Sequence, residues 1–558
     1  MQEYNLFMKK ILFSISIGIL AFTSSVYAQQ KKPNIILILA DDMGYSDLGC
    51  FGSEIKTPNL DKLAAEGLKL TQFYNAGRCC PSRAALLTGL YPHQAGVGDM
   101  LQNDSLEAYS THINYTSVTL AEVLKDAGYH TMISGKWHAG NEPEYWPIQR
   151  GFTDQYFSNG TTGHYFGIAK GRQYIVNGKE VNVPGDWIKS GESEYKLFKN
   201  ADGSQWYATD AIADHAIDFI KAADKEDKEK PFFLYLPFTA PHWPMHAFEE
   251  DIAKYQGKYM IGWDSLRVQR FNKMKSLGLI DPSWTISPRN EKVAAWNTLS
   301  DSAKIRNDRL MAVYAAMIDR LDQNVGKLLQ SLKETGDIDN TIIIFLADNG
   351  GCHEQVTKGK PGALPGTPES FDGYEYPWAN VSNTPFQWFK HWAHEGGTST
   401  PFIAWYPGVI KPGGVNASVG YIADIMPTVA EIGGATYPAQ YKGNKITPTV
   451  GQSLLPLFKG QTYKGHELLC WEHEGNRAVR KGDWKLVSRY DYKNNAELPW
   501  ELYNIKNDRS ETINLIQKNP EKVLELQKVY VDWSKKLNVV PYQQLLESRK
   551  KKSAGTKE

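Results

Sequence analysis

Two short apolar runs, each ending in a pair of oxygen-bearing side chains, constrain the fold more than any other feature of this sequence. The first covers residues 35–40 and is followed by two aspartates. The second covers residues 341–347 and is followed by an aspartate and an asparagine. Both runs are rich in isoleucine and leucine and show no polar alternation, which is typical of strands buried on both faces of a parallel sheet. We therefore expect two buried strands whose ends carry polar side chains.

Helical patterns alternate with further apolar runs along the chain. We predict strands at 129–134 and 231–238, and helices at 118–127 (with Ser117 as N-cap), 210–222 and 305–334. Strands alternating with helices predict an α/β fold, with a mostly parallel sheet sandwiched by helices. After residue 440 the pattern changes to short strands, at 471–487 and 501–503, and a helix at 520–537. We therefore predict a large α/β domain at 29–440 and a smaller α+β domain, with a short antiparallel sheet and a helix, at 441–558.

The N-terminus has the pattern of a signal peptide. Lys9 and Lys10 precede an apolar run at 11–22, and small residues lead to a cleavage site near Ala28. The run is short for a membrane span, although a retained anchor is the alternative. We expect residues 1–28 to be removed, and the protein to be exported to a bacterial periplasm or secreted, without stable membrane insertion.

Charge and cysteine content exclude further classes of protein. Lys plus Arg and Asp plus Glu are both 62, which argues against a strongly electrostatic nucleic-acid binder. Export permits disulfides, but five cysteines in 558 residues are too few for a disulfide framework. Because five is odd, at least one cysteine must be unpaired or chemically special. Whether any of the others pair stays open.

The polar pairs at the two strand ends are candidate metal ligands. They are Asp41 and Asp42 after the first strand, and Asp348 and Asn349 after the second. Ligands gather at the carboxyl ends of parallel strands, and an all-oxygen set suits a hard cation such as Ca²⁺ or Mg²⁺. Taken singly, each pair has the alternative role of capping the next helix or turn.

A second group of motifs surrounds Cys79. The segment C-C-P-S-R-A-A-L-L-T-G begins there, and it is followed in order by G-K-W-H at 135–138, A-P-H-W-P at 240–244, and Lys390 with E-G-G at 395–397. These motifs resemble those of the type I, formylglycine-dependent sulfatases of the alkaline phosphatase-like superfamily, and most resemble their bacterial arylsulfatase branch. The resemblance runs from about residue 33 to residue 515.

The resemblance implies a hydrolase of sulfate esters with a defined set of roles. A formylglycine-generating or sulfatase-maturating enzyme would oxidise Cys79 to formylglycine, whose gem-diol is the nucleophile. Asp41, Asp42, Asp348 and Asn349 would bind Ca²⁺, with Mg²⁺ as the other choice. Arg83 would contact the diol and a metal-binding carboxylate, and Asp348 would accept the diol's proton. His242, assisted by Lys390, would be the general acid, and His138 would be the base. Lys136 and Lys390 would contact the sulfate.

The sequence leaves several questions open. Aryl sulfates are expected test substrates, and sulfated sugars of glycans the natural ones, with the sulfate position undetermined. A further polar sulfate ligand is expected within residues 158–164. Arg78 and Glu354 are either substrate selectors or ordinary polar residues, and Trp471 and His473 belong either to the pocket rim or to the core. The alternatives in function are a phosphatase or phosphodiesterase of the same superfamily and a non-catalytic glycan-binding relative.

Overall fold

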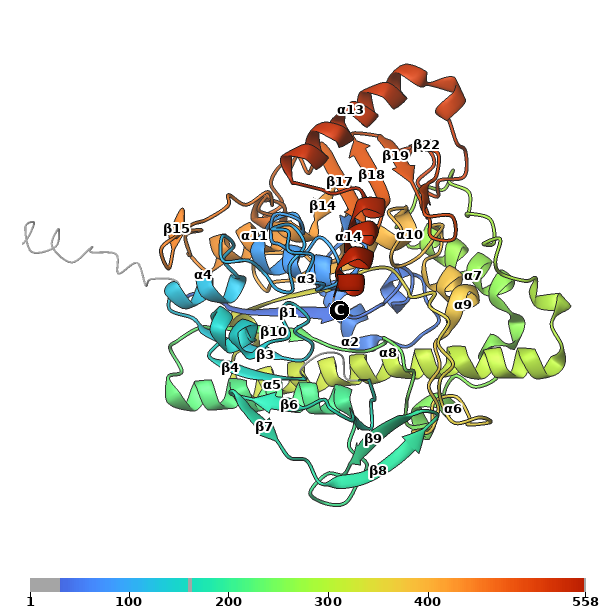
Figure 1. The fold of residues 1–558 in the computed structure, drawn as a ribbon. Coiled ribbons are helices and arrows are strands. Elements are labelled where there is room, and N and C mark those ends of the chain that lie inside the picture. Colours follow the sequence, from blue (N-terminus) through green and yellow to red (C-terminus); the bar gives the residue numbers. More distant parts are fainter. Residues whose placement is uncertain (1–30, 159–162, 556–558) are drawn as a thin grey trace, which may run out of the picture. The chain divides into compact units, whose positions relative to one another are not determined.

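A large mixed sheet forms the centre of the computed structural model, which describes residues 31–158 and 163–555; the predicted signal peptide lies outside them (Figure 1). Five neighbouring strands at its middle are parallel, in the order β11 (Thr341–Ala347), β1 (Asn34–Ala40), β10 (Phe232–Pro237), β3 (His130–Ser134) and β4 (Asp154–Ser158). Antiparallel pairs flank them, through β12 (Ser399–Trp405) and β2 (Leu68–Tyr74) on one side, and β6 (Tyr174–Val176) and β7 (Lys179–Val181) on the other. Short β13 (Gly414–Asn416) and β14 (Gly420–Tyr421) pair with β2.

Helices cover both faces of this sheet, as the uniformly apolar strands predict. Along β1, Ile36 and Ile38 pack into one core while Ile35 and Leu37 pack into the other, and all four are fully buried. The helices packed on the first core include α2 (Pro58–Glu66), α5 (Ala208–Glu226) and α8 (Asp301–Thr335). Those on the second include α3 (Cys79–Thr88), α4 (Leu120–Asp126) and α11 (Ile425–Ile432) (Figure 1). The predicted α/β class with a sandwiched sheet is confirmed.

Three predicted helix starts differ from the structure: α4 begins at Leu120 and not at 118, α5 at Ala208 and not at 210, and α8 at Asp301 and not at 305. Helix α4 is capped by Thr119, not Ser117: the Thr119 hydroxyl accepts from the Glu122 N–H, and the Glu122 carboxylate accepts from the Thr119 N–H. This reciprocal pair satisfies two free N–H groups at once, whereas Ser117 donates its hydroxyl to Asn114. Helix α8 begins four residues before the predicted start because the Ser300 hydroxyl caps it.

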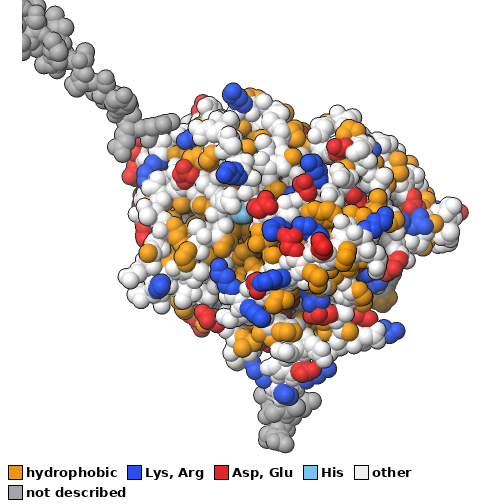
Figure 2. All heavy atoms as spheres, turned by 90° about the horizontal axis from the view of Figure 1, so that it is seen from above, with side chains coloured by type: hydrophobic (Ala, Val, Ile, Leu, Met, Phe, Trp, Pro, Cys, Tyr) orange, Lys and Arg blue, Asp and Glu red, His pale blue; other side chains and the backbone are white. Residues whose placement is uncertain are grey.

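The C-terminal part forms a small antiparallel sheet, in the order β17 (Leu468–His473), β18 (Asn476–Lys481), β19 (Trp484–Ser488) and β22 (Glu501–Asn504). Helix α13 (Pro520–Lys536) packs on it through Leu526 and Tyr530, as predicted. Helix α14 (Tyr542–Gly555) follows. Figure 2, viewed from above these elements, shows acidic and basic side chains interspersed with apolar ones.

Buried ion pairs join this sheet to the rest of the protein. Lys485 on β19 lies 2.8 Å from Glu395 and 3.0 Å from Glu511. Arg509 donates to the other oxygen of Glu395, at 2.6 Å. The Lys485, Glu395 and Glu511 side chains are all fully buried. Residues 33–558 accordingly form one compact unit, and the division at residue 440 stays a prediction.

The remaining α-helices and strands lie in the connections between these elements. They are α6 (Glu249–Ala253), α7 (Trp263–Ser276), α9 (Glu375–Ser382), α10 (Glu395–Thr398), α12 (Leu455–Phe458), the sheet of β5 (Gly167–Ala169), β9 (Ser193–Phe198) and β8 (Gly185–Ser190), and the pairs β15 (Gln440–Tyr441) with β16 (Asn444–Lys445) and β20 (Tyr490–Asp491) with β21 (Ala496–Glu497). None of the helices in residues 31–158 and 163–555 combines the length and apolarity needed to cross a bilayer. All five cysteines are free thiols, and Cys80 is fully buried.

Candidate active site

The two polar pairs of the sequence meet at one edge of the sheet. Strands β1 and β11 pair in parallel from Asn34 opposite Thr341 to Ala40 opposite Ala347, so both strands end level with each other. The Asp42 N–H then donates to Asp348 Oδ1 at 3.2 Å, and Asn349 Nδ2 donates to Asp42 Oδ1 at 2.7 Å. The register thus brings all four predicted ligands together, and we call Asp41, Asp42, Asp348 and Asn349 the acidic cradle.

The acidic cradle suits a hard cation. Asp41 Oδ1 and Asn349 Oδ1 are buried and have no hydrogen-bond partner among the described residues. Burial and the charge of Asp41 raise the pKa of Asp348 well above its ordinary value. Buried oxygens without partners and crowded carboxylates are costly by themselves, and a divalent cation bound to oxygen would relieve both costs. The donor set therefore fits the Ca²⁺ or Mg²⁺ predicted from sequence.

Three cations of the protein surround the cradle. Lys136 Nζ donates to Asp41 Oδ2 at 2.7 Å, and Lys390 Nζ donates to Asp42 Oδ2 at 2.9 Å. Arg83 donates to Asp348 Oδ2 from both Nε, at 3.1 Å, and a terminal nitrogen, at 2.8 Å. Although burial opposes it, Asp41 and Asp42 raise the pKa of Lys136 and Lys390 respectively, so both lysines stay charged. Arg83 therefore contacts one of the candidate metal-binding carboxylates.

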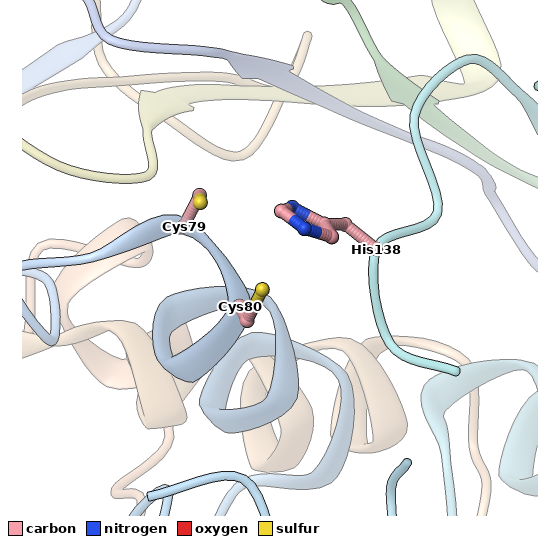
Figure 3. A group of neighbouring side chains, drawn as sticks. All are labelled: Cys79, Cys80 and His138. Carbon is pink, nitrogen blue, oxygen red and sulfur yellow. The ribbon is translucent and has the colours of Figure 1, made fainter. Parts of the chain in front are cut away.

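Cys79 is the first residue of α3, where free N–H groups favour negative charge. The Cys79 side chain is buried, and a hydrogen bond from the Cys80 thiol, followed by the charge of Lys136, holds the pKa of the Cys79 thiol well below its ordinary value. Figure 3 shows His138 on a separate loop, with its ring facing the first turn of α3. Burial lowers the pKa of His138, so the ring is neutral and able to accept a proton at neutral pH.

His242 lies next to the cradle. Its Nδ1 contacts the Trp243 carbonyl oxygen, and its Nε2 lies 3.5 Å from Asp42 Oδ2. The contact at Nδ1 orients the ring, so that Nε2 is the nitrogen presented to a ligand at the cradle. The site therefore combines a cation cradle, positive charge for an anion, and two histidines on different segments.

Arg78 and Glu354, whose roles sequence left open, form an ion pair at 2.9 Å. Glu354 also accepts from the Trp243 indole nitrogen at 2.7 Å, next to His242. No local pattern in the sequence links these residues, because the contact joins loops far apart in the chain. Of the expected loop at 158–164, residues 159–162 lie outside the described residues. Trp471 belongs to the core, where its indole donates to the Asn75 carbonyl.

Comparison with known proteins accounts for this arrangement. The sequence profile of the sulfatase family matches residues 33–435. The chain belongs to the sulfatase family. This sulfatase also matches, over residues 385–538, the profile described as N-sulphoglucosamine sulphohydrolase, C-terminal. It is therefore a sulfuric ester hydrolase, and the resemblance of its motifs to type I sulfatases is confirmed.

Its relatives match over nearly the whole chain. An uncharacterized sulfatase of Schizosaccharomyces pombe is 34% identical and covers 92% of this chain and 95% of its own. An arylsulfatase of Klebsiella aerogenes is 34% identical, with 80% and 96% covered. The human N-acetylgalactosamine-6-sulfatase is 30% identical, with 79% and 70% covered. The solved structure of Ps i-CgsB, in complex with k-i-k-neocarrahexaose, superposes with a TM-score of 0.63 at 27% identity and covers 90% and 93%.

Proposed function

We propose that this sulfatase is exported and removes sulfate from sugars, using formylglycine at position 79 and Ca²⁺ in the acidic cradle. The observation that carries the proposal is the cradle itself, whose unpartnered oxygens lie beside the start of α3 and between two buried lysines. The sugar substrate is supported by relatives named for N-acetylgalactosamine-6-sulfate and by a neighbour solved with an oligosaccharide. Export is supported by the signal-peptide pattern at 1–28.

Two groups would supply chemistry that the twenty ordinary side chains lack. A divalent cation held by Asp41, Asp42, Asp348 and Asn349 supplies charge that neutralises sulfate oxygens. Formylglycine supplies a hydrated aldehyde, whose hydroxyl is a hard oxygen nucleophile where the thiol of Cys79 is a soft one. The Cys79 sulfur of this structure therefore marks where that oxygen would stand.

The chain's own residues then bind the sulfate and move protons. Lys136 and Lys390 place positive charge where the sulfate oxygens would bind, and their positions are fixed by the cradle carboxylates before substrate arrives. His242 Nε2 would donate a proton to the departing sugar oxygen. His138 would accept a proton from the hydroxyl left at position 79, since its Nδ1 has no partner among the described residues.

Two measurements on protein from the native host test this proposal. Mass spectrometry of the peptide that contains Cys79 should show a mass about 18 Da lower than the cysteine form. N-terminal sequencing of the mature protein should begin near Gln29. An unmodified thiol in active protein would overturn the nucleophile, and a retained N-terminus would overturn the signal peptide.

A panel of sulfated mono- and disaccharides, scored by released sulfate beside aryl sulfate and aryl phosphate, tests the substrate class. We expect turnover of at least one sulfated sugar, and much slower turnover of the phosphate. Faster phosphate hydrolysis would support the phosphatase alternative instead. A formylglycine-containing protein that binds but does not desulfate the panel would support the glycan-binding alternative.

A further inference from the structure

A second group of metal-ligating side chains lies outside the acidic cradle. It consists of His391, His473 and Glu474, whose ligating atoms all lie within 4.8 Å of one another. His391 Nδ1 is 3.2 Å from Glu474 Oε2, and His473 Nε2 is 3.8 Å from Glu474 Oε1. His391 belongs to the loop that carries Lys390, whereas His473 and Glu474 lie at the turn between β17 and β18. None of the three belongs to the sulfate site described above.

His473 is the unexplained member of this group. It is 3% exposed, yet neither of its ring nitrogens has a hydrogen-bond partner among the described residues. Buried polar atoms almost always have partners, because leaving one unsatisfied costs free energy. We propose that His391, His473 and Glu474 bind a transition-metal ion of borderline softness, with Zn²⁺ as the best match.

The geometry and the donor types both favour zinc. Tetrahedral zinc with bonds near 2.0–2.1 Å places its ligand atoms roughly 3.4 Å apart. His391 Nδ1 lies 3.2 Å from one oxygen of Glu474 and His473 Nε2 lies 3.8 Å from the other, and one ligand atom of each residue lies within 4.8 Å of those of the other two, so a small rotation of the carboxylate would bring one oxygen toward both histidines. Two imidazoles and one carboxylate leave the fourth position to water. Ca²⁺ prefers oxygen ligands only, so the cradle and this group should select different ions.

The surroundings of His391 are those of a metal-bound histidine. Its Nε2 is hydrogen-bonded to the Tyr492 hydroxyl, which also accepts from Asn476 Nδ2 at 2.6 Å. Such a contact at the far nitrogen fixes ring orientation and leaves Nδ1 for the ion. His391 and Glu474 also hold positive φ angles of 90° and 48°, conformations that non-glycine residues adopt at a cost.

The charged groups around these three side chains, and their exposure to solvent, also permit a metal ion to bind there. Arg78 is the nearby cation that would oppose binding, but Glu354 pairs with it at 2.9 Å. Asp99, which also faces Glu474, is held by Arg549 of helix α14. The side chains of His391 and Glu474 are 12% and 18% exposed, so solvent reaches the site. The face shown in Figure 2 carries acidic and basic side chains interspersed, so it would not attract cations over a wide area. The three ligating side chains themselves would therefore select the ion.

A bound ion would fasten the Lys390 loop to the C-terminal sheet. His391 donates its backbone N–H to the Gly77 carbonyl oxygen at 2.8 Å, two residues before Cys79. The ion would therefore hold in place both the lysine and the strand-to-helix turn of the sulfate site, without touching substrate. Its role in that case is structural.

Cobalt binding tests the proposal on the full mature protein, stripped with chelator and reloaded with excess Ca²⁺. We expect one Co²⁺ per chain, with the strong visible absorption of a tetrahedral nitrogen–oxygen site, displaced by Zn²⁺ but not by Ca²⁺. His473→Ala should abolish it, and Tyr492→Phe, which keeps all three ligands, should weaken it by about 10–100-fold. His112→Ala, on a histidine outside the group, is the matched control.

Several outcomes would overturn the site. These are absence of Co²⁺ binding, undiminished binding in both His473→Ala and Tyr492→Phe, or a thiolate-to-cobalt band that assigns the ion to Cys80 and His138. If His473→Ala raised KM for a sulfated sugar while the Co²⁺ stoichiometry stayed at one, the group would belong to substrate binding instead. The cobalt-binding results do not require turnover and so do not depend on the proposed nucleophile, whereas the KM measurement uses enzyme whose Cys79 has been converted.

Discussion

Replacing Lys485 by methionine should destabilise the protein severely, because Lys485 neutralises buried carboxylates where the C-terminal sheet meets the catalytic part. Its Nζ lies 2.8 Å from Glu395 and 3.0 Å from Glu511, and all three side chains are fully buried. In Lys485→Met, Glu395 keeps Arg509, but Glu511 loses the nearest cation. Removing one partner of a buried ion pair costs about 3–5 kcal/mol of unfolding free energy.

Urea unfolding followed by circular dichroism measures this loss, with Lys481→Met as the matched control. Lys481 lies on the neighbouring strand β18, pairs with Glu525 at 2.7 Å and is 42% exposed, so its loss should lower the free energy of unfolding far less than the loss of Lys485. A difference of less than 1 kcal/mol between the two variants would refute the reasoning.

The pH dependence gives a second check on the same variant. Burial already raises the pKa of Glu511 above its ordinary value of 4.5, and removing Lys485 should raise it further. A carboxyl whose pKa is higher folded than unfolded binds its proton more tightly in the folded state. The loss of unfolding free energy in Lys485→Met should therefore be complete above the pKa of Glu511 in the folded variant, and it should shrink as the pH falls toward 4.5. A deficit that grows on acidification would contradict this assignment.

Three further predictions concern the active site. His242→Gln should lower kcat by about 10²–10⁴-fold for a sugar sulfate and by less for an aryl sulfate, whose leaving group needs less protonation; equal losses in steady-state assays would argue against a general acid. Burial lowers the pKa of His138 below 6.5, so the base is lost only as the pH falls through that lowered value; because His138 acts after the sugar has left, an acid limb of kcat centred above pH 6.5 would argue against it. Ca²⁺ at 100 times its Kd should stabilise the protein by about 2.7 kcal/mol in thermal unfolding. Asp41→Asn should lose most of that gain, whereas Asp186→Asn, at an exposed carboxylate, should keep it.

The strands and the place of several candidate site residues at their ends could be predicted from the sequence. Residues 35–40 and 341–347 are apolar throughout because both faces of the sheet are covered, and the sequence shows this directly. The oxygen-rich ends identified the cradle, since carboxyl ends of parallel strands share one edge. Helix starts were predicted less closely, because Ser117 and Thr119 are both good N-caps; the T-x-x-E spacing from Thr119 to Glu122 is the sequence signal that favours Thr119.

Contacts between distant loops were decided by the tertiary structure alone. Nothing in the local pattern around Glu354 indicates that it joins Arg78 to Trp243, and Lys485 looks like any strand lysine until Glu395 and Glu511 are placed beside it. The same holds for His391 and His473, which meet only because the β17–β18 turn packs against the loop after Lys390. The spacing of apolar residues in a sequence, and the residues that end each apolar pattern, indicate which face of a helix or strand is buried. Which charges meet across two elements depends on how those elements pack, and this is settled only when the chain folds.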